Sequence, residues 1–365
     1  MKNIYYSLLG ELDKSKRIVL ATILRTKGSA PQVPGASAVF SEDKLLAGTL
    51  GGGILEGDAS HRAREVIKHN SSVVYEFDLN ADISSEEGAI CGGTVKLLLD
   101  AGVDKKRDVL IALNKSLSLG KPGILATVIP GKDGSSAERF WLEYGEIKGG
   151  QIPGELKELR EEITSCLQKK ICQYVEKSNT FAVFLEPVYP LPRLVIAGAG
   201  HIGKALSHMA NLLDFEVTVI DNRPEYANPE NIPEADHIVV DSIGRAIGRI
   251  SKSSDTHIVI VTRGHRDDAD ALRACIESDL PYIGMIGSKR KISLMRENFL
   301  SKGWATEEQF DRVHAPVGLE IGSRTVQEIA VSILAQLVQV RNRDMSSGND
   351  PYITAIILAA GESRR

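Results

Sequence analysis

The sequence predicts an α/β protein with two domains, a mixed α/β domain followed by a doubly wound domain built on a parallel sheet. With 365 residues, 42% of them apolar, the chain is long enough to bury two cores. After residue 190, short β-type runs alternate with helical segments, which is the rhythm of a parallel sheet covered by helices on both faces. A glycine-rich turn between the first of these β runs and the next helix predicts the same fold.

Residues 1–187 are expected to form the mixed domain. Short runs rich in β-branched and other apolar residues predict its strands at 18–25, 36–40, 73–77, 95–99, 123–129 and 181–186. Two segments, 54–69 and 154–170, have the spacing of helices. The second carries the apolar stripe of an amphipathic helix, made by Leu156, Leu159, Ile163 and Leu167.

A proline-rich connector at 188–192 separates this domain from the doubly wound domain, which we place at 193–341. The polar segment 342–350 is expected to be a linker. The last residues, 351–365, resemble the opening of nucleotidyltransferase domains that carry L-A-A-G-x-S-x-R at their first phosphate loop, and would then be the truncated start of a third domain. An ordinary disordered tail is the alternative.

Composition excludes several classes of partner. The formal charge of -4 gives no electrostatic case for nucleic acid or an anionic membrane surface. No apolar run approaches the roughly 18 residues of a membrane helix, and the start of the chain lacks a signal peptide's apolar stretch, so a cytoplasmic location is expected. Four scattered cysteines make neither a disulfide framework nor a C-x-x-C zinc site.

The glycine-rich turn has the G-x-G-x-x-G spacing of a Rossmann-like domain, in Gly198, Gly200 and Gly203. The first glycine permits a tight turn, the second lets backbone N–H groups approach a pyrophosphate, and the third lets the helix pack on the strand. His201 lies inside the turn, where it either faces a phosphate or simply starts the helix. The helix N-terminus favours a bound anion, so a nucleotide site is one prediction.

Asp221 ends the next predicted strand and is placed to hydrogen-bond the hydroxyls of a ribose, as for NAD. Arg223, two residues later, is suited to the 2'-phosphate of NADP. The two residues leave open which nicotinamide cofactor, or which other nucleotide, would bind.

Three further segments are predicted at the carboxyl ends of strands, where ligands of open α/β sheets bind. The first, at 262–268, offers His265 as a site residue, or Asp267 as a helix cap. In the second, Gly287, Ser288 and Lys289 open a helix with three successive cations, which indicates an anion site, with a solvated basic helix face as the alternative. The third is the glycine-spaced loop at 314–322, whose composition requires no catalysis.

Two glycine loops of the first domain are also candidate sites. Gly51, Gly52 and Gly53 are interpreted as a nest of N–H groups for an anionic ligand, with a bulge or close backbone packing as the alternative. Cys91 is followed by two glycines that would let a ligand approach its thiol. It is either a functional thiol or an inert small apolar residue.

The ordered set of motifs resembles the XdhC/CoxI family of xanthine dehydrogenase accessory proteins over residues 1–341. The first half contributes G-S-A-P-x-x-P-G-A, G-T-L-G-G-G-I-L-E and C-G-G. The second contributes G-A-G-H-I-G, V-I-D-N-R-P, T-R-G-H-x-x-D, Y-I-G-M-I-G-S-K-R-K and P-V-G-L-E-I-G-S-x-T-x-x-E-I-A. Ala89 stands where a methionine is common in the family, and Gly-Gly-Gly-Ile where a cysteine or valine is expected.

The resemblance implies a maturation factor without turnover of its own. Such a protein would bind the molybdenum cofactor (molybdopterin), support its sulfuration with a cysteine desulfurase, protect it, and deliver it to a xanthine dehydrogenase or CO dehydrogenase type apoenzyme. The C-terminal fragment would connect it to a molybdenum cofactor nucleotidyltransferase. Glycine nests and cations would hold anionic groups, and Cys91 would contact or protect the metal, since thiolates are soft ligands.

The sequence is compatible with two other functions. An NAD(P)-dependent oxidoreductase would use the Rossmann-like turn, although no hydride-transfer acid or base is identified. A structural scaffold that brings a desulfurase and an apoenzyme together would need neither Cys91 nor an intact glycine turn. A homodimer is expected from the frequency of such assemblies.

Overall fold

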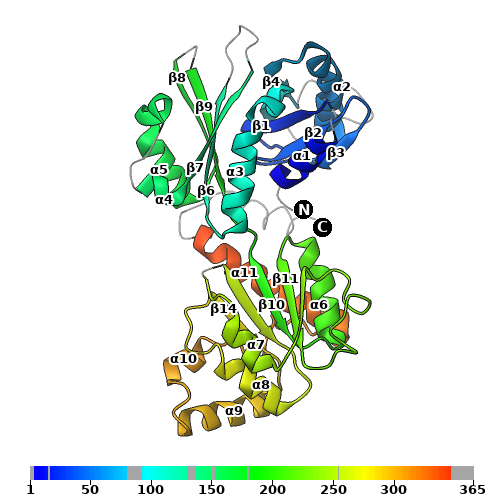
Figure 1. Ribbon diagram of the computed structural model, residues 1–365, viewed down its shortest axis with the longest axis vertical. Coiled ribbons are helices and arrows are strands. Elements are labelled where there is room, and N and C mark those ends of the chain that lie inside the picture. The colour runs from blue at the N-terminus through cyan, green and yellow to red at the C-terminus, as the bar shows by residue number, and fades with distance from the viewer. Residues whose placement is uncertain are drawn as a thin grey trace, which may run out of the picture. The chain divides into compact units, whose positions relative to one another are not determined.

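The computed structural model describes residues 4–14, 17–79, 93–129, 136–148, 153–178, 181–253 and 255–346. The chain divides into two compact units, Met1–Pro190 and Leu191–Arg365. In the described residues, the first unit contains two sheets and the second contains one (Figure 1). Each unit has its own hydrophobic cores. Among the described residues, no helix combines the length and the hydropathy needed to cross a membrane.

The first unit contains an antiparallel sheet of five strands. Its spatial order is β3 (Leu45–Gly48), β2 (Ser37–Phe40), β1 (Val19–Gly28), β5 (Gly93–Asp100) and β4 (Ser72–Asp78). Helix α2 (Gly53–His69) covers one face, burying Leu55, Ala59 and Ala63 against the central strands. This is the helix predicted at 54–69, and the strands predicted around it are confirmed.

A second antiparallel sheet in the same unit has four strands. Its order is β7 (Glu138–Glu143), β6 (Gly123–Ile129), β9 (Phe181–Val188) and β8 (Gln173–Ser178). The segment expected to be one helix at 154–170 is a 3-10 turn, η2 (Gly154–Leu159), followed by α5 (Arg160–Lys169). Its predicted apolar stripe is buried as expected.

Two helices that the sequence did not predict join these sheets. They are α1 (Ile4–Asp13) and α3 (Arg107–Ser118), the latter preceded by the 3-10 turn η1 (Gly102–Lys106). Tyr5 and Leu8 of α1 share a core with Leu110 of α3 and with residues of both sheets. A short helix, α4 (Tyr144–Lys148), follows β7.

The second unit is the predicted doubly wound domain. Its five parallel strands lie in the order β12 (His237–Val240), β11 (Glu216–Asp221), β10 (Arg193–Ala197), β13 (Thr256–Ile260) and β14 (Tyr282–Met285). Helices α6 (His201–Leu212) and α11 (Val326–Ser346) pack in one core. The other core takes residues from α7 (Ile243–Arg249), α8 (His265–Arg273), α9 (Lys289–Ser301) and α10 (Glu307–Asp311).

Strand order reverses at the middle of this sheet. From β10 the chain moves outward to β11 and β12, and it then returns to place β13 on the other side of β10. Such a reversal opens a crevice at the carboxyl ends of the two central strands, which is where open α/β sheets bind ligands. Helix α11 continues to Ser346, inside the segment expected to be a linker. Residues 351–365 lie outside the described part of the chain.

Candidate functional site

Two glycines of the G-x-G-x-x-G turn are required by the chain's own packing. Gly198 has a φ of +117°, and a Cβ there would lie 2.6 Å from the carbonyl oxygen of Val261. A Cβ at Gly203 would lie 1.9 Å from the carbonyl oxygen of Gly198. The first glycine therefore brings the turn after β10 against the end of β13, and the third brings α6 against the turn.

Gly200 has no such internal reason to be a glycine. Its φ of -72° suits any residue, and a Cβ would meet no atom within 4 Å. It is the N-cap of α6, and among the described residues no side chain caps that helix end. The missing side chain leaves the first-turn N–H groups of α6 open to a ligand, at the positive end of the helix dipole. His201, the next residue, is exposed.

The same arrangement recurs on the other side of the crevice. Gly264 is the N-cap of α8, its φ is -134°, and a Cβ would again meet nothing within 4 Å. No side chain within the described ranges caps this helix. Asp267, a predicted cap, lies in the first turn of α8 instead. Two uncapped helix N-termini thus flank the crevice between β10 and β13, each with a glycine that the fold does not demand.

Asp221 is held by its own chain. Its Oδ2 accepts hydrogen bonds from the Ala199 N–H (2.8 Å) and from Nη2 of Arg223 (2.8 Å). Its Oδ1 accepts from the N–H (3.0 Å) and the Nε (2.9 Å) of Arg223. Burial alone would raise the pKa of Asp221, but these bonds hold it below its ordinary value. The carboxylate fixes the glycine turn, and all four of its usual acceptor positions are used.

Arg223 is committed to the same pair. Besides its bidentate contact with Asp221, its guanidinium lies over the Tyr226 ring, 4.1 Å from the centroid. The hydrogen bond to Asp221 raises the pKa of Arg223 further. Residues predicted to contact a ribose and a 2'-phosphate therefore bind one another.

An ion pair with a buried carboxylate connects the first turns of α8 and α9. Asp268 is fully buried; its Oδ1 accepts a hydrogen bond from Thr262 (2.6 Å), and its Oδ2 pairs with Nζ of Lys291. The same Nζ donates to the Ile286 carbonyl at 3.3 Å. The aspartate of T-R-G-H-x-x-D and the last lysine of G-S-K-R-K are thus structural partners, and Lys291 is not free for a ligand.

At the predicted anion site at the start of α9, two of the three cations are available to a ligand. Lys289 and Arg290 are exposed and have no ion-pair partner among the residues described by the structure. Ser288 is the N-cap, and its Oγ accepts from the Lys291 N–H at 3.3 Å. Beside them lies a cavity of about 290 Å³, lined by His265, Ser288, Arg290, Lys291 and Leu294. Gly287 lies just before the cap, half-buried against Ile292.

The glycine-spaced loop at 314–322 is a structural element. The His314 ring stacks on Tyr282 with a centroid distance of 4.7 Å. The Gly318 N–H and the Tyr282 hydroxyl both donate to Oε1 of Gln336 in α11, at 2.8 and 2.7 Å. A Cβ at Gly318 would lie 2.3 Å from Oγ of Ser332. These contacts fasten the loop to α11.

In the first unit, the glycine nest is filled from within. Gly51, Gly52 and Gly53 all have positive φ, at +102°, +72° and +59°. Oε2 of Glu56, in the first turn of α2, accepts hydrogen bonds from the Leu50 and Gly52 N–H groups (2.9 and 3.3 Å) and from the Thr49 hydroxyl (2.8 Å). The anion in this nest is therefore the Glu56 carboxylate, which sequence reasoning overlooked although it lies three residues after Gly53.

Cys91 lies outside the described residues. Burial raises the pKa of Cys166 and of Cys275 to about 12, and that of Cys172 further, so these three are protonated thiols at neutral pH. Within the described ranges, no group of three His, Cys, Asp or Glu side chains is placed to hold a metal ion.

Two family models match the chain. The XdhC Rossmann domain model matches residues 194–337, and the XdhC and CoxI family model matches residues 12–78. Together they cover more than half of the chain.

Curated relatives and one solved structure extend these matches. A Bacillus subtilis protein described as a probable xanthine dehydrogenase subunit is 28% identical over 94% of this chain and 99% of its own length. The molybdenum cofactor insertion chaperone PaoD of Escherichia coli is 23% identical over 90% of this chain and 85% of its own. The uncharacterized protein YqeB of Escherichia coli is 38% identical, but over only 45% of this chain and 30% of its own.

A crystal structure described as a xanthine dehydrogenase of Bacillus halodurans superimposes with a TM-score of 0.76. It is 26% identical and covers 96% of this chain and 99% of that one. The motifs, the two family models and this full-length likeness agree, and the chain belongs to the XdhC/CoxI family.

Proposed function

We propose that this protein is a maturation factor that binds the molybdenum cofactor and supports its insertion into a xanthine dehydrogenase type molybdoenzyme. The observation that carries the proposal is the pair of uncapped helix N-termini at the crevice between β10 and β13. Gly200 and Gly264 both leave space that the fold does not use. The names of the relative from Bacillus subtilis and of PaoD support the choice of ligand and client.

The phosphate end of the cofactor fits these residues. The N–H groups at the start of α6 and α8 are placed to donate to phosphate oxygens, and Lys289 and Arg290 add positive charge at the neighbouring helix start. The metal end has no set of protein ligands within the described ranges. We therefore place the phosphate-binding site in the second unit. Cys91 stays the proposed contact for the metal.

In this mechanism the protein binds and orients, and the chemistry of the metal belongs to the cofactor and its client enzyme. The Asp221 pair fixes the glycine turn, so the α6 N–H groups are held in place before the ligand arrives. The Asp268–Lys291 pair does the same for the turns after β13 and β14. Lys289 and Arg290 are exposed cations that would attract the phosphate and release it to a client.

A nicotinamide-dependent oxidoreductase is less well supported. Binding a ribose through Asp221 would require breaking its bidentate contact with Arg223, and a 2'-phosphate would draw Arg223 from the same carboxylate. Each broken charged hydrogen bond costs on the order of 1.5–3 kcal/mol. A nicotinamide titration that gave neither binding nor reduction would exclude this function.

Several partners follow from the family resemblance and belong to the same proposal. They are the molybdoenzyme apoprotein, a cysteine desulfurase that sulfurates the bound cofactor, a molybdenum cofactor nucleotidyltransferase, and a second copy of the chain. Sedimentation velocity of the purified protein tests the homodimer, and sulfur transfer from a labelled desulfurase to retained cofactor tests the sulfuration. Replacing Cys91 by Ala tests its proposed role in both retention and transfer.

The function is tested by reconstitution. Free molybdenum cofactor is added to an apo xanthine dehydrogenase with and without this protein, and the activity recovered is measured over time. The proposal predicts a faster and larger recovery with the protein present, and protection of the cofactor during a delay in air before the apoenzyme is added. Equal recovery in both mixtures at every delay would contradict it.

A further inference from the structure

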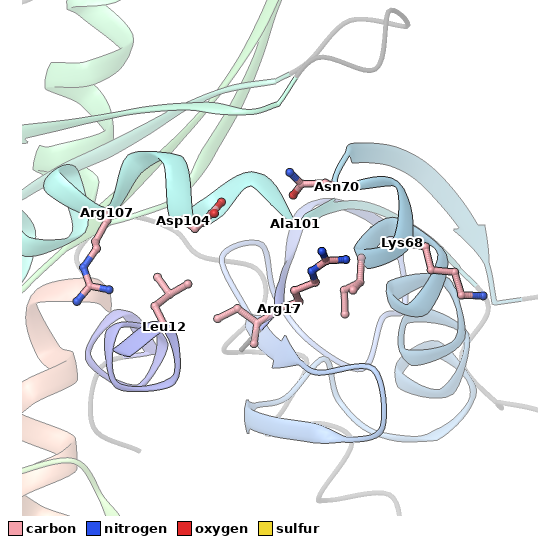
Figure 2. A pocket seen from close by; sticks show the side chains of 9 residues that line it. Leu12, Arg17, Lys68, Asn70, Ala101, Asp104 and Arg107 are labelled. Carbon is pink, nitrogen blue, oxygen red and sulfur yellow. The ribbon is translucent and has the colours of Figure 1, made fainter. Parts of the chain in front are cut away.

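A second cavity lies in the first unit, far along the sequence from the crevice. It has a volume of about 470 Å³, within the range of roughly 300–1,000 Å³ that small-molecule sites occupy. Four places in the fold supply its walls: the end of α1, the residues that precede β1, the end of α2, and the segment from β5 to the start of α3 (Figure 2).

Three cations line this cavity, and two of them have other partners. Lys68 pairs with Glu65 at 2.7 Å, and its side chain runs away from the other labelled residues in Figure 2. Arg107 pairs with Asp13 at the edge of the cavity. Arg17 is exposed and has neither an ion-pair nor a hydrogen-bond partner in the part of the chain that the structure describes. Its guanidinium is therefore available to an anion.

Side chains that accept hydrogen bonds lie across the cavity from Arg17. The side chains of Asp104 and Asn70 are directed toward each other in Figure 2, with the Arg17 guanidinium below them. Neither side chain has a hydrogen-bond partner within the described ranges. An ionised carboxylate accepts hydrogen bonds only, and an amide oxygen accepts as well, so this side of the cavity suits a ligand with several donor groups.

The floor of the cavity is apolar and rigid. Ile18, Ile67 and Ala101 are 3%, 2% and 9% exposed, and each belongs to a packed core of the unit. Such a floor accepts the carbon skeleton of a ligand without rearrangement. The cavity thus has one free guanidinium, two acceptors opposite it and an apolar floor between them. These groups suit a molecule with an anionic group at one end and hydroxyl groups along its body.

We propose that this cavity binds a small polyhydroxylated organic anion, with its phosphate or carboxylate on Arg17 and its hydroxyl groups on Asp104 and Asn70. The fork of a guanidinium matches the geometry of both kinds of anionic group. The site is independent of the crevice in the second unit, and its ligand is distinct from the cofactor proposed there.

Calorimetric titration of the full chain with ribose 5-phosphate, gluconate and inorganic phosphate tests this. One of the two hydroxylated anions is expected to bind, and which one identifies the anionic group. Arg17→Gln should weaken binding by at least about tenfold, as expected for loss of a charged hydrogen bond. Asp104→Asn should weaken binding less, because the amide keeps one of the two acceptor oxygens of the carboxylate. Arg160→Gln removes an exposed arginine of the same unit that lies outside the cavity, and should change nothing.

Three results would overturn the proposal. They are no binding of either hydroxylated anion at millimolar concentration, an affinity unaffected by Arg17→Gln, and inorganic phosphate binding as tightly as the better of the two. Because Arg17 and Asp104 are exposed, their variants should fold like the parent, which a thermal unfolding scan confirms. A Gly200→Ser variant should bind the anion normally, which separates this test from that of the proposed function.

Discussion

Nζ of Lys291 pairs with Oδ2 of Asp268, and this contact joins the first turn of α9 to the first turn of α8. Asp268 is fully buried, whereas the Lys291 side chain is 28% exposed. The two partners therefore differ in what happens when the other is removed. A carboxylate left in the interior loses the cation that it pairs with, but a lysine left alone can turn toward water.

We expect Lys291→Met to be the more damaging of the two substitutions. It should destabilise the second unit by about 3 kcal/mol, because the Asp268 charge stays buried without a cation. Asp268→Asn keeps an acceptor for Thr262 and should cost about 1 kcal/mol. Trp304 is the only tryptophan of the second unit, so its fluorescence in a Trp141→Phe background reports the unfolding in urea.

The double variant sharpens this test. If the buried charge is the cause, Asp268→Asn in the Lys291→Met background should restore stability, since it removes the unpaired carboxylate. Losses that simply add up would show that the two residues act independently.

Substitutions of the packing glycine Gly203 and of the open glycine Gly200 should differ in their effect on the free energy of unfolding. Gly203→Ala should lower the free energy of unfolding by about 2 kcal/mol, because its Cβ would overlap the Gly198 carbonyl at 1.9 Å. Gly200→Ser should be neutral or slightly stabilising, since the space is open and serine is a good N-cap. Thermal unfolding of the two variants decides this, and equal losses would contradict the assignment of Gly200 to ligand access.

Removing the carboxylate from the first-unit nest should create an anion site. Glu56→Ala leaves the N–H groups of Leu50 and Gly52 without their acceptor, which should cost about 2 kcal/mol. Added acetate or phosphate should then raise the unfolding temperature of Glu56→Ala more than that of the parent protein. Glu65→Ala, which removes an exposed acid of the same helix, is the matched control. An equal effect of the anions on all three proteins would contradict the account of this nest.

The first unit should become less stable as the pH rises toward neutrality, because of Glu186. Burial raises the pKa of this carboxyl from 4.5 to about 7, against the hydrogen bond from Tyr5 and the charge of Arg139. A raised folded-state pKa means that the folded state holds the proton more tightly. Its stabilising contribution is therefore complete below pH 4.5 and is lost as the pH rises through 7.

Glu186→Gln isolates that contribution from other titrating groups. The stability of the variant relative to the parent should increase between pH 4.5 and 7 and level off above that range. Trp141, the only tryptophan of the first unit, reports the unfolding in a Trp304→Phe background. Parallel curves for the two proteins would show that Glu186 keeps its ordinary pKa.

The fold was largely predictable, and its exceptions have physical causes. The alternation of β runs and helices after residue 190 is a local pattern, so the sequence alone predicts the doubly wound domain. Helix α1 escaped prediction because it has no acidic residue in its first turn and no basic residue in its last turn. The start of α3 is masked by the 3-10 turn that precedes it.

The place of the glycine turn in the fold was predictable, but the contacts around it were not. The glycine spacing located the turn, yet only the atoms around Gly200 and Gly203 show which glycine serves packing and which leaves room for a ligand. Lys291 and Asp268 are separated by 23 residues, and a run of cations does not reveal which one is paired. The contacts of Asp221 and Glu56 were not predictable for the same reason. Each accepts hydrogen bonds from a glycine turn whose N–H groups were predicted to bind a ligand.

Retention of molybdenum by the Gly200→Ser variant shows whether the N-terminus of α6 holds the cofactor. Parent, Gly200→Ser and Gly248→Ser proteins are incubated with molybdenum cofactor, desalted, and assayed for bound molybdenum by mass spectrometry. Gly248 is an exposed glycine of α7 with equally open surroundings, so its substitution is the matched control. We expect retention by the parent and by Gly248→Ser, and a loss of at least about tenfold in affinity for Gly200→Ser. No retained molybdenum in the parent, or equal retention in all three proteins, would contradict it.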